Sequence, residues 1–327
     1  MSALRRDWPL VIVGSGPAGI SVALAAKRRG IDALIVEKGS LCNTIFDFPE
    51  RMQFFSTSEL LEFSGIPLVS LGSKPTKREV LDYFTRLVLV NKLPFVTHTR
   101  VADMRSDGVQ KIVVSSRGEF RAHAVVLATG SYDHPNMLGI EGEELPHVSH
   151  YFHAAHPCIG LQTVVVGGKN SAAEAALELY RSGARVTIIH RRDAMSSSIK
   201  YWIKPDLENR IRDGGIKLHL STVLRRIEHN SVTVENEGGR FQVPADAVFL
   251  LTGYNPDYAW LRGQGIEFEG QAELPVHNPA TLESNVEGIY LAGVLLAGRE
   301  TSRVFIENSR FHGDMIINDF ANKFLNG

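Results

Sequence analysis

Residues 10–38 read LVIVGSGPAGISVALAAKRRGIDALIVEK. Leu10–Val13 is a short, fully apolar run of the kind that forms a buried parallel strand, and Ala33–Val36 is a second such run. Between them, a glycine-rich turn precedes Ile20–Arg29, whose alanine-rich composition is typical of a helix that ends at Gly30. Strand, glycine turn, helix and strand within about 30 residues predict a dinucleotide-binding βαβ unit.

The turn itself, Gly14-Ser15-Gly16-Pro17-Ala18-Gly19, matches the Gly-x-Gly-x-x-Gly fingerprint in the required place between strand and helix. Its glycines allow a tight turn, close approach of a pyrophosphate, and close packing of helix on strand. Glu37 follows the second strand and is placed to accept hydrogen bonds from a ribose diol. Because an acid there disfavours a 2′-phosphate, we expect FAD or NAD rather than NADP. The alternative is a glycine turn that serves chain geometry only.

The same plan returns in the middle of the chain. Thr163–Val166 is a β-branched run, the turn 167–172 reads GGKNSA, and a helical stretch leads to the apolar run Val186–Ile189. This fingerprint is looser, because Lys169 stands at the second-glycine position and Ala172 at the third. After its second strand the chain carries Arg191 and Arg192, whose guanidinium groups can pair with a 2′-phosphate. We therefore expect NADPH at this turn, although an exposed basic turn without a ligand remains the alternative.

Two dinucleotide units define the expected organisation. Further apolar strands end in small residues at Ala128-Thr129-Gly130, Thr252-Gly253 and Ala292-Gly293, and alternating patterns predict antiparallel meanders at residues 100–121 and 223–243. If the strand before Gly293 returns to the first sheet, the second unit is inserted into the first. We therefore predict an α/β protein with two Rossmann-type domains, FAD-binding at 1–133 and 257–327 and NADPH-binding at 134–256.

Composition excludes several function classes. The 35 basic and 36 acidic side chains give a net charge of −1, which leaves no surplus for binding nucleic acid or an anionic membrane. The sequence contains no run of 18 apolar residues, so we expect no membrane-spanning helix. The glycines at 14–19 interrupt the N-terminal apolar stretch at positions where the helix of an export signal would be continuous. We expect a cytoplasmic protein.

The cysteines and histidines also limit the chemistry. The two cysteines, Cys42 and Cys158, lie far apart, which excludes a Cys-x-x-Cys redox pair and a four-thiolate zinc site. His150, His153 and His156 are spaced by three, which on a helix would align them as metal ligands. Pro157 and the lack of acidic or thiolate partners favour a connecting segment instead, so we predict no metal site.

One ribose site with an acid and another with arginines indicate two different dinucleotides on one chain, and hence hydride transfer from NADPH to a flavin. Through Ala128-Thr129-Gly130, the turn His190–Asp193 and the stretch 288–293 (GIYLAG), the chain resembles flavoproteins of the low-molecular-weight thioredoxin reductase type. It lacks their Cys-x-x-Cys, so a dithiol relay is impossible. It also has Val294 where they carry an aspartate that contacts the flavin side chain.

A closer resemblance is to bacillithiol-disulfide-reductase-like flavoproteins. It rests on irregular motifs spread along the chain: residues 48–49 with 54–58, 74–75, 150–152 with 155–157, 167–172, 198–200 with 202–203, 253–254 with 256–258, and 305–308 with 311–313. The resemblance implies an FAD enzyme that uses NADPH to reduce a low-molecular-weight disulfide such as oxidised bacillithiol. Members often carry a cysteine inside the first fingerprint, where this chain has Ala18. Either the flavin reduces the disulfide directly, or another group substitutes, or the acceptor differs.

The expected site residues follow from both readings. For FAD they are Gly14, Gly16, Pro17, Ala18, Gly19, Glu37, Lys38, Thr129, Gly130, Gly293 and Val294. For NADPH they are Gly167, Gly168, Lys169, Asn170, Ser171, Ala172, His190, Arg191, Arg192 and Gly253. Cys42, Cys158 and His312 are the candidates for catalysis, each balanced by an ordinary role in the core.

Other functions remain open at this point. A flavin monooxygenase, a ferredoxin–NADP reductase of the thioredoxin-reductase-like type, and a nucleotide-binding redox sensor without turnover would share the two dinucleotide folds. We expect a small-molecule disulfide as substrate, no nucleic-acid or membrane partner, and a homodimer or larger homo-oligomer, as the resemblance implies.

Overall fold

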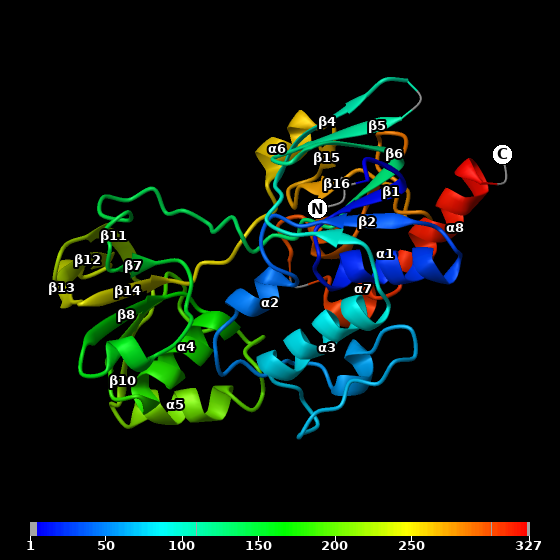
Figure 1. Ribbon diagram of the computed structural model, residues 1–327. Helices are drawn as coiled ribbons and strands as arrows, with labels where there is room; N and C mark the ends of the chain where they lie inside the picture. Colours follow the sequence, from blue (N-terminus) through cyan, green and yellow to red (C-terminus); the bar gives the residue numbers. More distant parts are fainter. Residues whose placement is uncertain (1–4, 109, 302, 326–327) are drawn as a thin grey trace. The chain divides into compact units, whose positions relative to one another are not determined.

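The computed structural model describes residues 5–108, 110–301 and 303–325, and the chain forms two compact units (Figure 1). The first unit comprises the chain up to Asp47, Met52–His134, and the chain from Tyr254 onward; the second comprises Phe48–Arg51 and Pro135–Gly253. The two main junctions lie within a few residues of those expected from the sequence. The short segment Phe48–Arg51 was not foreseen in the second unit, where the Glu50 N–H donates to the carbonyl of His153 over 2.8 Å.

The first unit is built on a sheet whose strands run in the order β3-β2-β1-β6-β5-β4, with β17 beside β6. β1 pairs in parallel with β2 and β6, and β17 pairs in parallel with β6. The last strand therefore returns to the first sheet, which confirms that the second unit is inserted into the first. The strands are β1 (Asp7–Val13), β2 (Ala33–Val36), β3 (Phe95–Val96), β4 (Val101–Ser106), β5 (Lys111–Ser115), β6 (Gly118–Leu127) and β17 (Ile289–Leu291).

β6 carries the first meander, because its beginning pairs antiparallel with β5 while its end pairs in parallel with β1. A separate ribbon joins β15 (Phe268–Glu269) to β16 (Leu274–Pro275). The helices of this unit are α1 (Pro17–Arg28), α2 (Asn43–Asp47), α3 (Lys77–Val90), α6 (Tyr258–Gly263), α7 (Ile306–Ser309) and α8 (His312–Phe324), with 3₁₀ turns η1 (Ser58–Leu61) and η3 (Gly293–Ala297).

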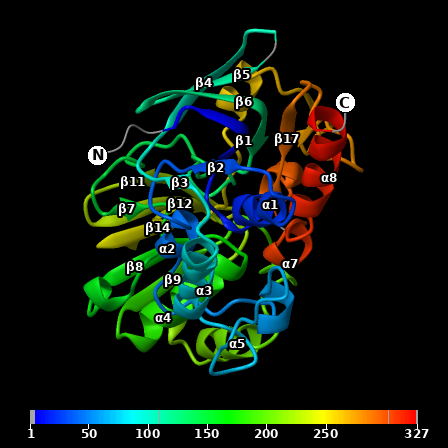
Figure 2. The same ribbon diagram turned by 45° about the vertical axis from the view of Figure 1, so that its right-hand side comes forward.

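Local chemistry sets the helix positions. α3 begins after Thr76, whose hydroxyl accepts the Glu79 N–H while the Glu79 carboxylate accepts the Thr76 N–H, so two free amides are satisfied. α1 and α8 lie side by side (Figure 2). They approach closely because Gly313 has no side chain, and a Cβ there would lie 2.4 Å from the Ser21 carbonyl oxygen.

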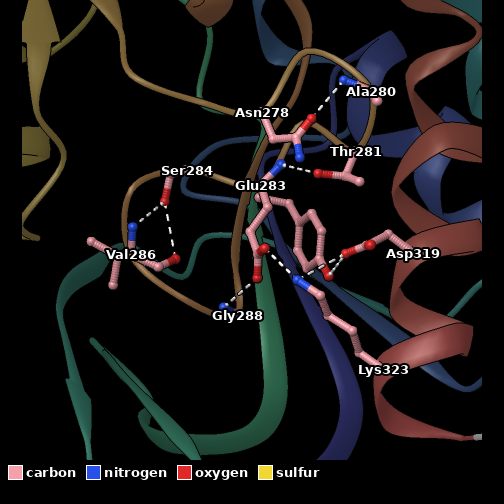
Figure 3. Close-up of polar contacts among 10 residues, drawn as sticks. Asn278, Ala280, Thr281, Glu283, Ser284, Val286, Gly288, Asp319 and Lys323 are labelled. Carbon is pink, nitrogen blue, oxygen red and sulfur yellow. Dashed lines mark hydrogen bonds and ion pairs between the residues drawn. The ribbon is translucent and has the colours of Figure 1, made fainter.

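A polar network ties α8 to β17 (Figure 3). The hydroxyl of Tyr290, which is fully buried, donates to the Asp319 carboxylate over 2.6 Å. Lys323 pairs with Glu283 and lies 3.3 Å from Asp319, while Glu283 accepts the N–H of Gly288 over 2.9 Å. The C-terminal helix is thus held to the sheet by charged groups as well as by apolar packing.

The second unit has a parallel sheet in the order β10-β9-β8-β14-β7 and a separate antiparallel meander β11-β12-β13. Along β8 the side chains alternate: Val165 packs in the cluster with the helices, while Val164 and Val166 pack against the meander. The elements are β7 (Val148–Ser149), η2 (His156–Cys158), β8 (Gln162–Val166), α4 (Asn170–Arg181), β9 (Arg185–Ile189), α5 (Lys204–Arg212), β10 (Ile216–His219), β11 (Val223–Ile227), β12 (Ser231–Asn236), β13 (Gly239–Pro244) and β14 (Ala247–Leu250).

The parallel strands β3-β2-β1-β6-β17 of the first unit and the parallel sheet of the second confirm the α/β class with two dinucleotide-binding folds. Within the described ranges, none of the helices combines the length and the apolar character needed to cross a membrane.

Candidate nucleotide-binding sites

The first glycine turn connects β1 to α1 and is packed so tightly that two of its glycines are required by the fold. Gly14 has φ +110°, and a Cβ there would lie 2.3 Å from the carbonyl oxygen of Ala128. At Gly19 a Cβ would lie 2.1 Å from the carbonyl oxygen of Gly14. These two positions therefore close the strand–turn–helix corner, as the fingerprint predicts.

Gly16 is different, because a Cβ built there meets no atom within 4 Å among the described residues. Its φ of −68° suits any residue, so neither sterics nor backbone conformation explains the glycine. Gly16 directly precedes α1, whose first turn contains no acidic residue. Open space at a helix N-terminus fits an anionic group such as a pyrophosphate.

Glu37 is buried, at 7% exposure, and its carboxylate already has three donors. One oxygen accepts the N–H and the hydroxyl of Ser15, each over 2.8 Å, and the other accepts the N–H of Gly39 over 2.8 Å. Since each carboxylate oxygen has two lone pairs, the oxygen facing Gly39 retains a position for one ribose hydroxyl. Glu37 thus fits a ribose and also joins the turn to the end of β2; the contribution of Ser15 was not foreseen from the sequence.

The strand ends β6 and β17 converge on the same turn. Gly130 has φ +70°, and a Cβ built there would meet no described atom within 4 Å. Beyond the end of β6, Asp133 pairs with Lys38 over 2.7 Å. At Gly293, φ is +79° and a Cβ would lie 2.8 Å from the Cβ of Ala18. The structure therefore brings the expected FAD residues of all three strand ends together around α1, with half-buried Val294 at the start of η3.

His312 forms a hydrogen bond with the backbone of the Gly293 turn. Its Nδ1 accepts the Gly293 N–H over 3.1 Å, so the neutral ring carries its proton on Nε2. Burial, with a smaller contribution from nearby His277, lowers the pKa of His312 to about 4. The ring is therefore neutral at physiological pH.

Both cysteines are buried. Cys42, 1% exposed and at φ +55°, donates its thiol to the carbonyl of Ser15 over 3.3 Å, and its N–H donates to the Ser15 hydroxyl over 3.1 Å. Burial, and then the Glu37 charge, raises the pKa of Cys42 to about 12. Burial also raises the pKa of Cys158. Since the thiolate is the reactive form, neither environment favours thiol chemistry.

The second glycine turn, between β8 and α4, is shaped by a histidine. At Gly168 a Cβ would lie 2.1 Å from the ring of His190, so the glycine makes room for that imidazole. Burial lowers the pKa of His190, helped by the charges of Arg192 and Arg191. Both arginines are exposed after the end of β9, and Ala172 is buried within the first turn of α4.

Asn170 is expected to contact the nucleotide, but both the oxygen and the nitrogen of its side-chain amide form hydrogen bonds with other residues of the chain. Its Oδ1 accepts the Lys200 N–H over 2.8 Å and its Nδ2 donates to the Ser198 carbonyl over 3.2 Å. Lys169 and Ser171 beside it are exposed. Gly253, at φ +96°, lies at a junction between the units, where Asn136 bonds to neighbouring Thr252.

The spaced histidines do not gather. His150 lies 3.4 Å from buried Glu143, the ring of His153 stacks on Tyr151, and His156 belongs to η2. The described residues contain no group of three or more His, Cys, Asp or Glu side chains placed to hold a metal.

Comparisons with known proteins agree along the length of the chain. The family model for pyridine nucleotide-disulphide oxidoreductases matches residues 11–293. Bacilliredoxin reductase Bdr from Bacillus subtilis is 38% identical over 315 residues, covering 96% of this chain and 97% of that protein. The solved structure of bacillithiol disulfide reductase Bdr from Bacillus cereus matches with a TM-score of 0.95 at 36% identity, covering 97% and 100% of the two chains. A ferredoxin–NADP reductase from Ignicoccus hospitalis is 27% identical over 294 residues, covering 86% and 88%.

Proposed function

Because this chain belongs to the family of pyridine nucleotide-disulphide oxidoreductases, we propose that it passes electrons from NADPH through FAD to a low-molecular-weight disulfide such as oxidised bacillithiol. Members of the family depend on FAD and a nicotinamide nucleotide, and the chain is an oxidoreductase. The resemblance to bacillithiol disulfide reductases is confirmed. The observation that carries the proposal is the contrast between Glu37 after one glycine turn and Arg191 with Arg192 after the other.

The first unit supplies the FAD site in this proposal. The open space at Gly16 would take the pyrophosphate at the α1 N-terminus, and the remaining acceptor position of Glu37 would take a ribose hydroxyl. The other residues that would surround FAD are Gly14, Pro17, Ala18, Gly19, Lys38, Thr129, Gly130, Gly293 and Val294. When bound, the flavin accepts a hydride from the nicotinamide and passes two electrons to the acceptor.

The second unit would hold NADPH. Its pyrophosphate would lie at the α4 N-terminus, beside the turn from Gly167 to Ser171, and its 2′-phosphate would pair with Arg191 and Arg192. In this assignment Gly168 and His190 contact each other rather than the ligand. Gly168 leaves space for the ring of His190, the residue directly before Arg191 and Arg192.

We further propose that electrons reach the disulfide without a protein thiol. The chain has only two cysteines, both are buried, and Ala18 stands where bacillithiol-disulfide-reductase-like proteins often carry a cysteine. The overall reaction balances without them: NADPH, one proton and the disulfide give NADP⁺ and two thiols. Cys42 then has a structural role, because its thiol and its N–H both donate hydrogen bonds to Ser15.

Replacing the two arginines tests the nucleotide assignment. Arg191→Ala with Arg192→Ala removes the charges that would recognise the 2′-phosphate, so KM for NADPH should rise at least about tenfold while KM for NADH changes little. Steady-state kinetics with each nucleotide measures both values. An equal rise for the two nucleotides would contradict the assignment.

A second acceptor class is favoured by the missing thiol. Reduction of a protein electron carrier needs no thiol on the enzyme, and the relative from Ignicoccus hospitalis is a ferredoxin–NADP reductase. Stopped-flow measurement of flavin reoxidation by ferredoxin and by oxidised bacillithiol separates the two. Fast reoxidation by ferredoxin alone would replace the disulfide proposal.

We place the activity in the cytoplasm, in a homodimer or larger homo-oligomer. A cytoplasmic setting supplies both NADPH and a reduced thiol pool, consistent with two free cysteines. Light scattering of the purified protein measures the assembly, and a molar mass near 36.1 kDa would contradict it.

A further inference from the structure

The segment His190–Lys200, called here the arginine loop, begins at the end of β9 and returns to α4. Its first residues carry the two exposed arginines, and its last residues, Ile199 and Lys200, are buried. The start of the loop bonds to the connection after β10, where the Arg192 carbonyl accepts the Ser221 N–H over 2.8 Å and the His190 carbonyl accepts the Thr222 N–H over 3.0 Å. The buried end fixes the other side of the loop, so the contacts at both ends together decide where the guanidinium groups lie.

Three hydrogen bonds and one ion pair join the arginine loop to α4 and to the turn before it. The N–H of Ser196 donates to the Gly168 carbonyl over 2.9 Å. The side chain of Asn170 bonds to the carbonyl of Ser198 and to the N–H of Lys200. The Lys200 ammonium lies 2.5 Å from the Glu174 carboxylate, one helical turn beyond Asn170.

The Lys200–Glu174 pair is an unusual way to hold a surface loop. The side chain of Lys200 is 7% exposed and that of Glu174 is 19% exposed, and the ammonium lies 5.6 Å from the centre of the Trp202 ring. Burying an ammonium is costly unless a partner compensates it, so the ion pair with Glu174 ties the end of the loop to α4. Burying an apolar side chain at this position would cost less desolvation free energy, but it would not fix the direction of the loop end.

We propose that Lys200 and Glu174 are positioning residues for NADPH: their pair fixes the arginine loop against α4 and so holds Arg191 and Arg192 where the 2′-phosphate binds. The inference rests on the proposed NADPH site. A guanidinium held in place before binding loses less conformational freedom when it pairs with phosphate, and the pair therefore strengthens selectivity for NADPH over NADH.

The test removes both charges together, because a single substitution would leave one buried charge without its partner. The holoenzyme variant Lys200→Met with Glu174→Gln is compared with Arg181→Met with Asp206→Asn, which neutralises a more exposed pair at the other end of α4. Calorimetry measures the binding of adenosine 2′,5′-bisphosphate and of adenosine 5′-monophosphate. Hydrogen exchange measures protection of the amides in residues 190–200.

We expect the buried-pair variant to bind the bisphosphate about tenfold more weakly, with unchanged binding of the monophosphate and faster exchange in the arginine loop. The control pair should change neither, and Lys200→Arg should retain the wild-type preference. An unchanged preference for the bisphosphate would overturn the proposal. So would equal weakening of both ligands, which is the result of a merely structural role.

The two proposals fail differently. If the wild-type protein does not prefer the bisphosphate, the NADPH assignment is wrong, whatever the variant does. Unchanged exchange in residues 190–200 of the variant would show that the pair does not hold the loop. If the double variant does not fold, Asn170→Ala removes the middle contacts without touching a charge and must lower the preference in the same direction.

Discussion

At the residue scale, each glycine turn contacts the residue that follows the second strand of its unit, but through different groups. In the first unit, Ser15 follows the first glycine and donates to Glu37, the residue after β2. In the second, Gly168 follows the first glycine and admits the ring of His190, the residue after β9. The position of Glu37 directly after β2 could be read from the fingerprint. Its bonds to Ser15, and the fit of His190 on Gly168, could not, because they depend on side chains brought together only by the sheet.

Gly16→Ala separates ligand binding from folding. Since a methyl group there meets no described atom, the apoprotein should fold and lose at most about 1 kcal/mol, because Gly16 is the N-cap of α1 and alanine caps a helix less well. FAD should bind about 10- to 100-fold more weakly, because the methyl occupies the pyrophosphate space. Apoprotein titration with FAD measures the affinity. Gly263→Ala, at an equally open position at the end of α6 and without positive φ, is the control for an added methyl group and should leave the FAD affinity unchanged. A Gly16→Ala variant with wild-type FAD affinity would contradict the placement of the pyrophosphate.

His312 should make stability depend on pH in the acid range. The ring titrates at about 4 when folded and near 6.5 when unfolded, so between these values the unfolded chain binds a proton that the folded chain does not. Stability is therefore full above pH 6.5 and falls as the pH drops toward 4, by at most about 1.4 kcal/mol per pH unit. His312→Asn keeps an acceptor for Gly293 but does not titrate.

Urea unfolding between pH 4 and 6.5 checks this prediction. The slope of stability against pH should be smaller in His312→Asn than in wild type, by about 1 kcal/mol per pH unit. His98→Asn, at an exposed histidine, should retain the wild-type slope. Equal slopes in the wild type and the His312 variant would show that His312 does not titrate as its burial requires.

At the scale of elements, the predictable parts are those encoded by neighbouring residues. β1, α1, β2 and the corresponding β8, α4, β9 follow apolar runs and glycine turns that can be read locally. The short elements α2, α7 and η3 have no such pattern, because their conformation is set by contacts with elements that are distant in the sequence, such as α3 for α2 and α1 for α7. The network between β17 and α8 belongs to this second kind, since Tyr290 and Asp319 come from separate elements.

Tyr290→Phe measures the strength of that network. It removes a buried hydrogen bond to a carboxylate, so the free energy of unfolding should fall by about 1.5–3 kcal/mol. Chemical denaturation monitored by circular dichroism gives the value. Tyr201→Phe, at a tyrosine that is 70% exposed, should change it by less than about 0.5 kcal/mol. Similar values for the two variants would mean that the Tyr290–Asp319 bond does not stabilise α8.

At the scale of the whole molecule, the repeat predicted from two glycine turns is realised as one unit inserted into another. The sequence predicted the insertion on the condition that the strand before Gly293 returns to the first sheet, and the pairing of β17 with β6 meets that condition. The placement of Phe48–Arg51 in the second unit could not, because it depends on a backbone bond from Glu50 to His153 rather than on a sequence pattern.

The central claim is that NADPH reduces a small disulfide through the flavin of this protein without help from a protein thiol. The most direct test is an anaerobic titration of the cysteine-free variant, Cys42→Ser with Cys158→Ser, in which serine keeps a hydroxyl donor for the carbonyl of Ser15. The visible flavin band is followed during addition of NADPH and then of oxidised bacillithiol, with the wild-type protein in parallel. The band should bleach with NADPH and return with the disulfide in both proteins. Bleaching that the disulfide reverses only in the wild type, or in neither protein, would contradict the claim.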